Sequence, residues 1–92
     1  MICSFGDVRT EALFRDHFVR QFQGIAPPAK RKLEAFNAAS GLEDLAVTPS
    51  NRMEKLKGRL KGFYSIRINE QWQVIFRWVE GEPHEVRIVD YC

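Results

Sequence analysis

Basic side chains gather in one short stretch of the sequence, between Arg52 and Lys61. The stretch contains a single acid, Glu54, and it leads directly into a run that carries Arg67. Its cations are Arg52, Lys55, Lys57, Arg59 and Lys61. Cations grouped along one edge and one face of a sheet can neutralise several phosphates, although the net charge of the whole chain is only +2. A solvated strand edge gives the same pattern, because lysines there prevent edge-to-edge pairing of sheets.

The run that follows, residues 63–78, consists of two segments rich in β-branched and aromatic residues on either side of residues 69–71. This pattern predicts a β-hairpin, in which successive side chains point to opposite faces. One face is therefore expected to be apolar, and its residues are Tyr64, Ile66, Ile68, Trp72, Val74, Phe76 and Trp78. The other face carries cationic and amide groups, among them Arg67 and Gln73, and is either a binding site or simply solvated.

The N-terminal part of the chain is expected to cover the apolar face with two amphipathic helices. Asp7 suits the N-cap of a helix over about residues 8–19. A second helix is predicted over about residues 28–40, since prolines are tolerated in a first helical turn. Its core-facing stripe is Ala29, Leu33 and Phe36.

Short strands and turns account for the rest of the chain. Strands are predicted at residues 1–5, 52–58 and 85–91, with a loop at 42–53 and a turn at 80–83. Consecutive strands with short connections pair antiparallel, and helices must then pack on one face of the sheet. Residues 1–92 are therefore predicted to form a single α+β domain, with two N-terminal helices packed on one face of an antiparallel sheet.

Other kinds of chemistry find little support in the sequence. His17 and His84 fit no metal-ligand spacing, and Cys3 and Cys92 form neither a disulfide framework nor a zinc site, so no metal or cofactor is expected. Charged residues interrupt the N-terminal region, so neither a secretory signal nor a membrane span is expected. The residues alone predict a cytoplasmic α+β domain with a basic face, no membrane partner, and RNA as the candidate ligand.

Several segments resemble a known family. They are Met1-Ile2-x-Ser4-Phe5, Asn51-Arg52-Met53-Glu54-x-Leu56-Lys57-Gly58, Tyr64-Ser65-Ile66-Arg67-Ile68-Asn69-x-Gln71-Trp72 and Ile88-Val89-Asp90-Tyr91. Together they span essentially the whole chain and are similar to the HigB toxin family, also called plasmid-maintenance killer proteins, of the RelE/ParE superfamily. The resemblance implies a RelE-like fold.

The resemblance also implies a function. Members of this family are small bacterial toxins that cut messenger RNA in the ribosomal A site and so inhibit translation. A helix-turn-helix antitoxin of the HigA type, encoded just downstream, neutralises them, and the pair represses its own promoter. The implied partners are a HigA-type antitoxin and the ribosome with its mRNA, with operator DNA bound only through the antitoxin complex.

Carried over residue by residue, the resemblance implies a metal-independent cleavage in which the 2′-hydroxyl of the substrate is the nucleophile. Lys57 and Arg67 would stabilise the charged phosphorane, and Asp90, Tyr91 and Cys92 complete the implied catalytic set. The residues expected to contact RNA outside this set are Arg52, Lys55, Arg59, Lys61 and Gln73.

Two positions depart from the family pattern. Gln73 stands where the family usually carries Arg, and Cys92 stands where it usually ends in His. An amide donates hydrogen bonds without charge, and a thiol is less suited than an imidazole to move protons near neutral pH. A catalytically attenuated toxin that acts mainly as an antitoxin-binding co-repressor is therefore one alternative. A ParE-like inhibitor of DNA gyrase is another, which the retained Lys57, Arg67, Asp90 and Tyr91 disfavour.

Overall fold

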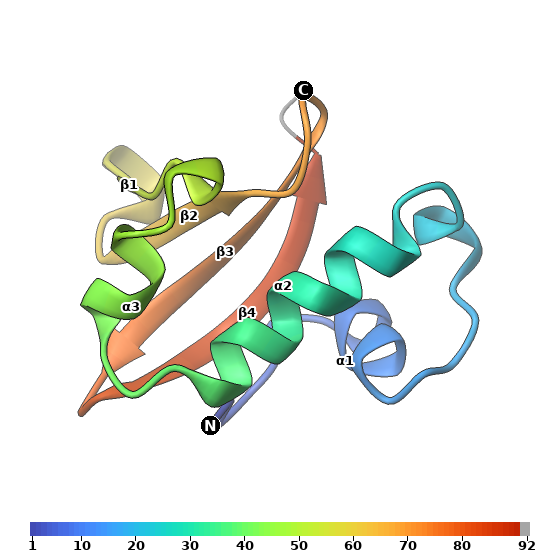
Figure 1. The fold of residues 1–92 in the computed structure, drawn as a ribbon, viewed down its shortest axis with the longest axis horizontal. Helices are drawn as coiled ribbons and strands as arrows, with labels where there is room; N and C mark the ends of the chain where they lie inside the picture. The colour runs from blue at the N-terminus through green and yellow to red at the C-terminus, as the bar shows by residue number, and fades with distance from the viewer. Residues whose placement is uncertain (91–92) are drawn as a thin grey trace.

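The computed structural model describes residues 1–90 of the chain, and its helices precede its sheet (Figure 1). The helices are α1 (Val8–Phe14), α2 (Ala26–Ala38) and α3 (Leu42–Ala46), with short 3₁₀ turns η1 (Arg20–Phe22), η2 (Pro49–Asn51) and η3 (Gly58–Leu60). The strands are β1 (Glu54–Lys55), β2 (Phe63–Arg67), β3 (Trp72–Val79) and β4 (Glu82–Asp90). They form one antiparallel sheet in the order β1-β2-β3-β4, and α1 and α2 lie on one side of it, which confirms the α+β prediction.

Helix α1 begins as predicted and ends early. The Asp7 carboxylate accepts a hydrogen bond from the Thr10 amide at 2.7 Å and caps the first turn. The prediction of a helix up to residue 19 was wrong, because Asp16 takes a left-handed backbone with φ 66°. The ammonium of Lys30 then binds the Asp16 carboxylate at 2.8 Å and the carbonyl of Phe14. A contact from α2 therefore holds the end of α1, and it is not visible in the local sequence.

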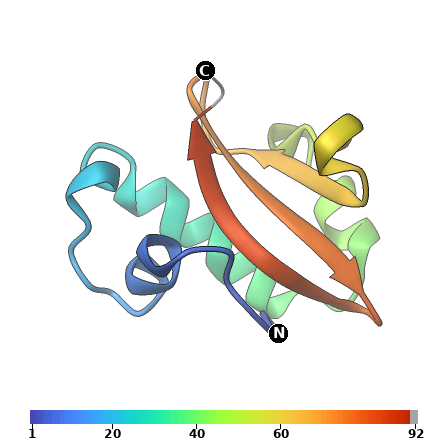
Figure 2. The ribbon, with the colours of Figure 1, turned by 180° about the vertical axis from the view of Figure 1, so that it is seen from behind.

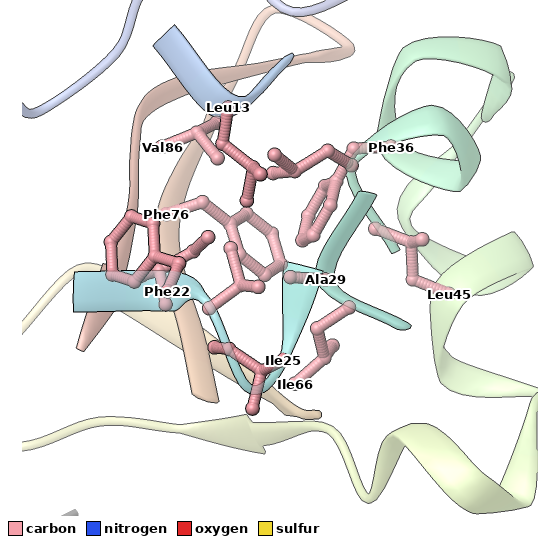
Figure 3. Close-up of a cluster of buried hydrophobic side chains, with 12 residues drawn as sticks. Leu13, Phe22, Ile25, Ala29, Phe36, Leu45, Ile66, Phe76 and Val86 are labelled. Atoms are coloured by element: carbon pink, nitrogen blue, oxygen red, sulfur yellow. The ribbon is translucent and has the colours of Figure 1, made fainter. Parts of the chain in front are cut away.

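Helix α2 supplies the predicted apolar stripe. Ala29, Leu33 and Phe36 are all fully inaccessible to solvent, which confirms the predicted core face of this helix. The rings of Phe36 and Phe76 meet edge to face, with centroids 4.5 Å apart, and Phe76 is fully buried (Figure 3). Complete burial of a side chain of this size contributes about 1.5–3 kcal/mol to folding. The contact between α2 and β3 is thus the centre of the core.

Trp72 packs at the rim of the core. Its ring meets that of Phe22 at a right angle, with centroids 5.7 Å apart, and it stays half-buried. Val74 and Phe76, the next residues on the same face of β3, have no solvent exposure. The apolar face predicted for β3 is therefore confirmed, with Trp72 covered by η1 rather than by α2.

The β2–β3 hairpin turns where the sequence predicted it, at residues 69–71. The side-chain carbonyl of Asn69 accepts hydrogen bonds from the amides of Gln71 and Trp72, both at 2.8 Å. An Asn side chain that bonds the backbone two residues ahead replaces a backbone turn bond and stabilises a tight connection. The position of this turn sets the pairing of β2 with β3.

Two elements before the hairpin differ from the sequence prediction. The expected strand over residues 52–58 is reduced to Glu54 and Lys55, because left-handed backbone at Arg52 (φ 43°) and Gly58 (φ 67°) turns the chain away on both sides. The expected loop over residues 42–53 contains α3 and η2 instead. Leu45 of α3 is 2% exposed, so burial of one side chain anchors this short helix.

Strand β4 is longer than predicted, because the turn before it is shorter. Glu80 and Gly81 alone make the turn, with φ of 51° and 83°, and both positive values suit a two-residue hairpin. The pairing with β3 shifts between Ile75 and Arg77, where Glu85 has φ 51° and forms a β-bulge. The amide of Glu85 is satisfied by the hydroxyl of Ser4 at 2.8 Å. A bulge of this kind bends the strand and re-aims the side chains beyond it.

The N-terminal segment lies beside β4. The amide of Cys3 donates to the carbonyl of Pro83 at 2.9 Å, and the amide of Gly6 donates to that of Val86 at 2.8 Å. The expected edge strand at residues 1–5 is thus a single parallel bridge, between Phe5 and Val86. Within residues 1–90, no helix is long and apolar enough to cross a membrane.

Candidate nucleic-acid interface

The face of the sheet that points away from α2 is not crossed by any helix of residues 1–90 (Figure 2). Strand register decides which side chains share this face, which we call the open face. Arg67 of β2, Gln73 of β3 and Val89 of β4 form one row across it. Ser65, Ile75 and Arg87 form the next row, and Glu54 of β1 stands beside Ser65.

Arg67 and Gln73 are the predicted site residues that the structure brings together. They are direct partners in the β2–β3 pair, and both are half-buried. The Nε atom of Arg67 donates to the backbone carbonyl of Asn69 at 3.1 Å, which fixes the stem of the side chain. Direct antiparallel partners have Cβ atoms roughly 4.5–5.5 Å apart, so one phosphate can contact both side chains.

Arg77 is a further cation on the open face, beyond those that the sequence analysis selected as site residues. Its Nε atom forms an ion pair with Glu85 at 2.8 Å, and its guanidinium lies 4.7 Å from the centre of the Phe63 ring. The alternation of β3 had placed Arg77 on this face, but its charge was not weighed as part of a site. A Cβ atom added to Gly62 would lie 3.5 Å from the Nη1 atom of Arg77. The guanidinium of Arg77 therefore lies beside the loop that follows η3.

Arg87 of β4 is another cation of the open face that the sequence analysis did not select as a site residue. It pairs with Ile75 in register and is half-buried. Its Cδ atom lies 3.0 Å from the position that a Cβ at Gly6 would take. Alternation along the end of β4 places Arg87 and Val89 on the face opposite Ile88 and Asp90, so the signal was present in the sequence beyond the bulge.

The middle of the open face is more apolar than the sequence analysis expected. Phe63 is 8% exposed and Ile75 is 2% exposed, and Ser65 is buried between them. Aliphatic stems of arginine cover apolar surface while their charged ends stay in water. The face therefore consists of an apolar floor with arginine ends around it, and not of a uniformly polar surface.

Three of the predicted lysines border a separate hollow. Lys55, Lys57 and Lys61 line a hollow of about 410 Å³ together with Leu56, Gly58 and Gly62. The amide of Leu56 donates to the carbonyl of Phe63 at 2.9 Å, so this hollow lies at the Phe63 end of β2. Arg67 lies at the other end of the strand, roughly 13 Å away along four residues.

The remaining cations of the basic stretch lie outside that hollow. Arg59 is exposed within η3, and Arg52 is exposed directly after η2. Register places Glu54 next to Ser65 and Lys55 next to Tyr64, so the acid and the lysine of β1 project to opposite faces of the sheet. The basic stretch therefore forms an edge rather than a continuous patch with Arg67.

Asp90 lies at the same end of the sheet as Arg67. It is the last residue of the described part of β4 and pairs with Trp72, and its carboxylate accepts a hydrogen bond from the side-chain Nε2 of Gln71 at 3.0 Å. Two strand spacings, about 10 Å, separate β2 from β4. As the direct partner of Trp72, Asp90 lies on the helix side of the sheet, opposite the open face. It lines a hollow of about 350 Å³ together with Phe22 and Trp72. Tyr91 and Cys92 lie outside the described residues.

Comparison with solved structures identifies the class of fold. The chain superposes on the YoeB–YefM complex from Staphylococcus aureus with a TM-score of 0.57 and 18% identity, over 91% of this chain and 90% of the other. A YoeB/ParE toxin from Agrobacterium tumefaciens gives a TM-score of 0.53 and 16% identity, over 94% of this chain and 96% of the other. At these identities the likeness concerns the fold alone, which is that of RelE-like toxins.

The sequence defines the family within that class. Residues 12–91 match the family described as the RelE-like toxin of type II toxin–antitoxin system HigB. Toxin HigB-1 of Vibrio cholerae serotype O1 is 53% identical over 90 residues, which cover 78% of this chain and 95% of the relative. The chain belongs to the HigB-like toxin family. The resemblance stated from its sequence segments is thereby confirmed.

Proposed function

We propose that this toxin is a ribosome-dependent endoribonuclease that cuts messenger RNA in the A site and so inhibits translation. Its family supports this, because RelE-like toxins are generally endoribonucleases. The observation that carries the proposal is the open face, where Arg67 and Gln73 stand side by side with Arg77 and Arg87 around an apolar floor. Cations bind phosphates, and flat apolar surfaces suit the faces of unstacked bases.

The proposed reaction needs no metal ion. The 2′-hydroxyl of the substrate attacks the adjacent phosphate, the hydroxyl proton is removed, and the 5′-oxygen of the leaving nucleotide is protonated as its bond to phosphorus breaks. Arg67 and Lys57 stabilise the charge that gathers on the phosphorane, and Asp90, Tyr91 and Cys92 handle the protons. Lys57 lies beside the Phe63 end of β2 and Arg67 lies at the other end, so in the proposed reaction both long side chains must extend along β2 toward the same phosphate.

The other predicted contacts hold the RNA and its ribosomal surroundings. Arg52, Lys55, Arg59 and Lys61 lie along the β1 and η3 edge, where each adds one phosphate contact. Gln73 donates hydrogen bonds beside Arg67. The proposed partners include a HigA-type antitoxin, and binding to operator DNA runs through the toxin–antitoxin complex. A ribosomal substrate places the site of action in the cytoplasm.

One observation favours a weaker activity. The neutral Gln73 is the direct partner of Arg67, at the position where the family usually supplies a second cation. The second candidate function is therefore an attenuated toxin that serves mainly as an antitoxin-binding co-repressor. Gyrase inhibition has no such support in the described residues.

The test is induced expression followed by mapping of mRNA ends on ribosomes. The toxin should arrest growth, and new 5′ ends should appear within codons in the A site, while deproteinised mRNA should stay intact. Arg67→Ala should abolish the new ends, and the matched control Arg20→Ala, which removes an exposed arginine of η1, should keep them. Growth arrest without new mRNA ends, together with DNA damage, would instead point to gyrase. Absence of both arrest and cleavage, with promoter repression retained, would identify the attenuated form.

A further inference from the structure

A groove of about 570 Å³ is lined by residues of α2, α3 and η2. Its apolar lining includes Ala35 and Ala38 of α2, Leu45 of α3, and Ile68 beyond the end of β2. Arg31, Lys32 and Asp44 contribute its charges. The groove is larger than the hollows beside Lys57 and Asp90 and shares none of their lining residues.

Lys32 is the unusual residue of this groove. Its ammonium donates to the side-chain carbonyl of Asn51, whose own amide donates to the carbonyl of Leu45 at 3.0 Å. Asn51 is 4% exposed, so the ammonium is held against a buried polar group. Within residues 1–90, no carboxylate lies within ion-pair distance of Lys32. Burial, and next to it the charge of Arg31, lowers the pKa of this ammonium.

The nearby Lys30 of α2 differs from Lys32, because its ammonium forms ion pairs with acids of this chain. It pairs with Asp16 at 2.8 Å and with Glu34 at 3.2 Å. Lys32 lies on roughly the opposite side of the same helix and has one neutral acceptor in place of two acids. A partly buried cation that lacks a counter-charge is stabilised by an incoming carboxylate.

We infer that this groove receives an acidic segment of the antitoxin, with an Asp or Glu carboxylate bound to Lys32 and Arg31 and apolar side chains placed against Leu45 and Ile68. The inference rests on the antitoxin partner of the proposed function and adds its binding site and chemistry. A polyanion such as RNA fits less well, because the floor is apolar and Asp44 stays ionised beside it. The amide of Ser40 donates to the Asp44 carboxylate and lowers its pKa.

The experiment uses the proposed HigA-type antitoxin, expressed from the gene neighbouring that of the toxin and purified with it. Lys32→Met removes the charge and keeps the length of the side chain, and Lys32→Arg keeps the charge. The affinity should fall about tenfold or more in Lys32→Met, since a charged hydrogen bond is lost, and Lys32→Arg should restore most of it. The matched control Arg20→Met, with the same change of charge on exposed η1, should bind like the unchanged toxin.

A zero-length carbodiimide cross-linker gives a second and direct readout. It joins an ammonium to a carboxylate in contact with it, so the complex should yield a cross-linked peptide pair between Lys32 and an Asp or Glu of the antitoxin. Lys32→Arg should lose this pair while it still binds. Thermal unfolding of each variant establishes that a loss of binding does not come from loss of the Asn51 contact.

Three outcomes would overturn the inference. They are unchanged affinity in Lys32→Met, absence of the cross-link from a tight complex, and failure of the unchanged toxin to bind the neighbouring protein at micromolar concentration. Weaker binding of a single-stranded oligoribonucleotide by Lys32→Met, with antitoxin binding unchanged, would assign the groove to RNA and also overturn it. Cleavage of mRNA is measured separately, so failure of the proposed activity and failure of this docking site are distinguishable.

Discussion

Arg67 and Gln73 face each other across the β2–β3 pair on the open face of the sheet. One side chain is always charged and the other is a neutral amide, so this row offers one cation and one pair of amide donors to a phosphate. Because the two residues are direct register partners, a charge introduced at position 73 would lie beside Arg67 in the proposed site. This pair is therefore the most informative place to alter the strength of the proposed site.

Gln73→Arg should raise the rate of mRNA cleavage. A second guanidinium beside Arg67 adds charge where the phosphorane forms, and one such donor is worth about 100-fold or more in the chemical step. Single-turnover cleavage on programmed ribosomes measures the effect. Gln23→Arg adds the same charge at an exposed position after η1 and should leave the rate unchanged. An equal or lower rate for Gln73→Arg would show that position 73 does not face the reacting phosphate.

Lys57→Ala and Lys55→Ala should differ, although both residues border the same hollow. Loss of a cation that stabilises the transition state costs about 3 kcal/mol in the chemical step. Loss of an ordinary phosphate contact weakens binding and reduces its salt dependence by about one charge. We expect the first result for Lys57 and the second for Lys55, from ribosome affinity across a salt series and single-turnover cleavage. Indistinguishable variants would make the whole lysine hollow a docking surface.

Thr10→Val should destabilise the fold through one hydrogen bond. Thr10 is completely buried, and its hydroxyl accepts the amide of Ile88 at 3.0 Å, which ties α1 to β4. Valine keeps the volume but leaves that amide without a partner in the core, at a cost of about 1–3 kcal/mol. Urea unfolding measures the loss. Thr10→Ser keeps the hydroxyl and should retain more stability than Thr10→Val, and the reverse order would contradict the role of this bond.

Asp44 should make the free energy of unfolding depend on pH in the acidic range. Its carboxylate accepts hydrogen bonds from the backbone N–H and from the hydroxyl of Ser40, both at 2.9 Å. The hydrogen bond from the backbone N–H is the main cause of the lowered pKa of Asp44. A lowered pKa in the folded state stabilises the fold at pH values above the pKa of the unfolded state, which is about 3.9 for Asp. This stabilisation is lost as the pH falls through the lower pKa of the folded state. The stability difference between the unchanged toxin and Asp44→Asn should therefore be constant near neutral pH and vanish in acid. A difference that persists below both pKa values would assign it to another cause.

The sequence by itself determined the elements whose cause is local. The spacing of Ala29, Leu33 and Phe36 predicted the buried face of α2, and Asn69 marked the hairpin turn, because periodicity and turn chemistry depend on residues close together in the chain. The segments quoted for the resemblance also indicated the family that the comparisons show.

Tertiary structure decided what depends on contacts between distant residues. Helix α1 ends at Phe14 because Lys30 of α2 binds there, and β4 carries a bulge whose amide is satisfied by Ser4, far away in the sequence. The length of β2 likewise separates Lys57, which lies near its Phe63 end, from Arg67 at its other end, and register places Arg87 on the open face. Alternation along one strand states which side chains share a face, but only the pairing between strands sets the distances across it. The physical basis of the site therefore lies in that pairing.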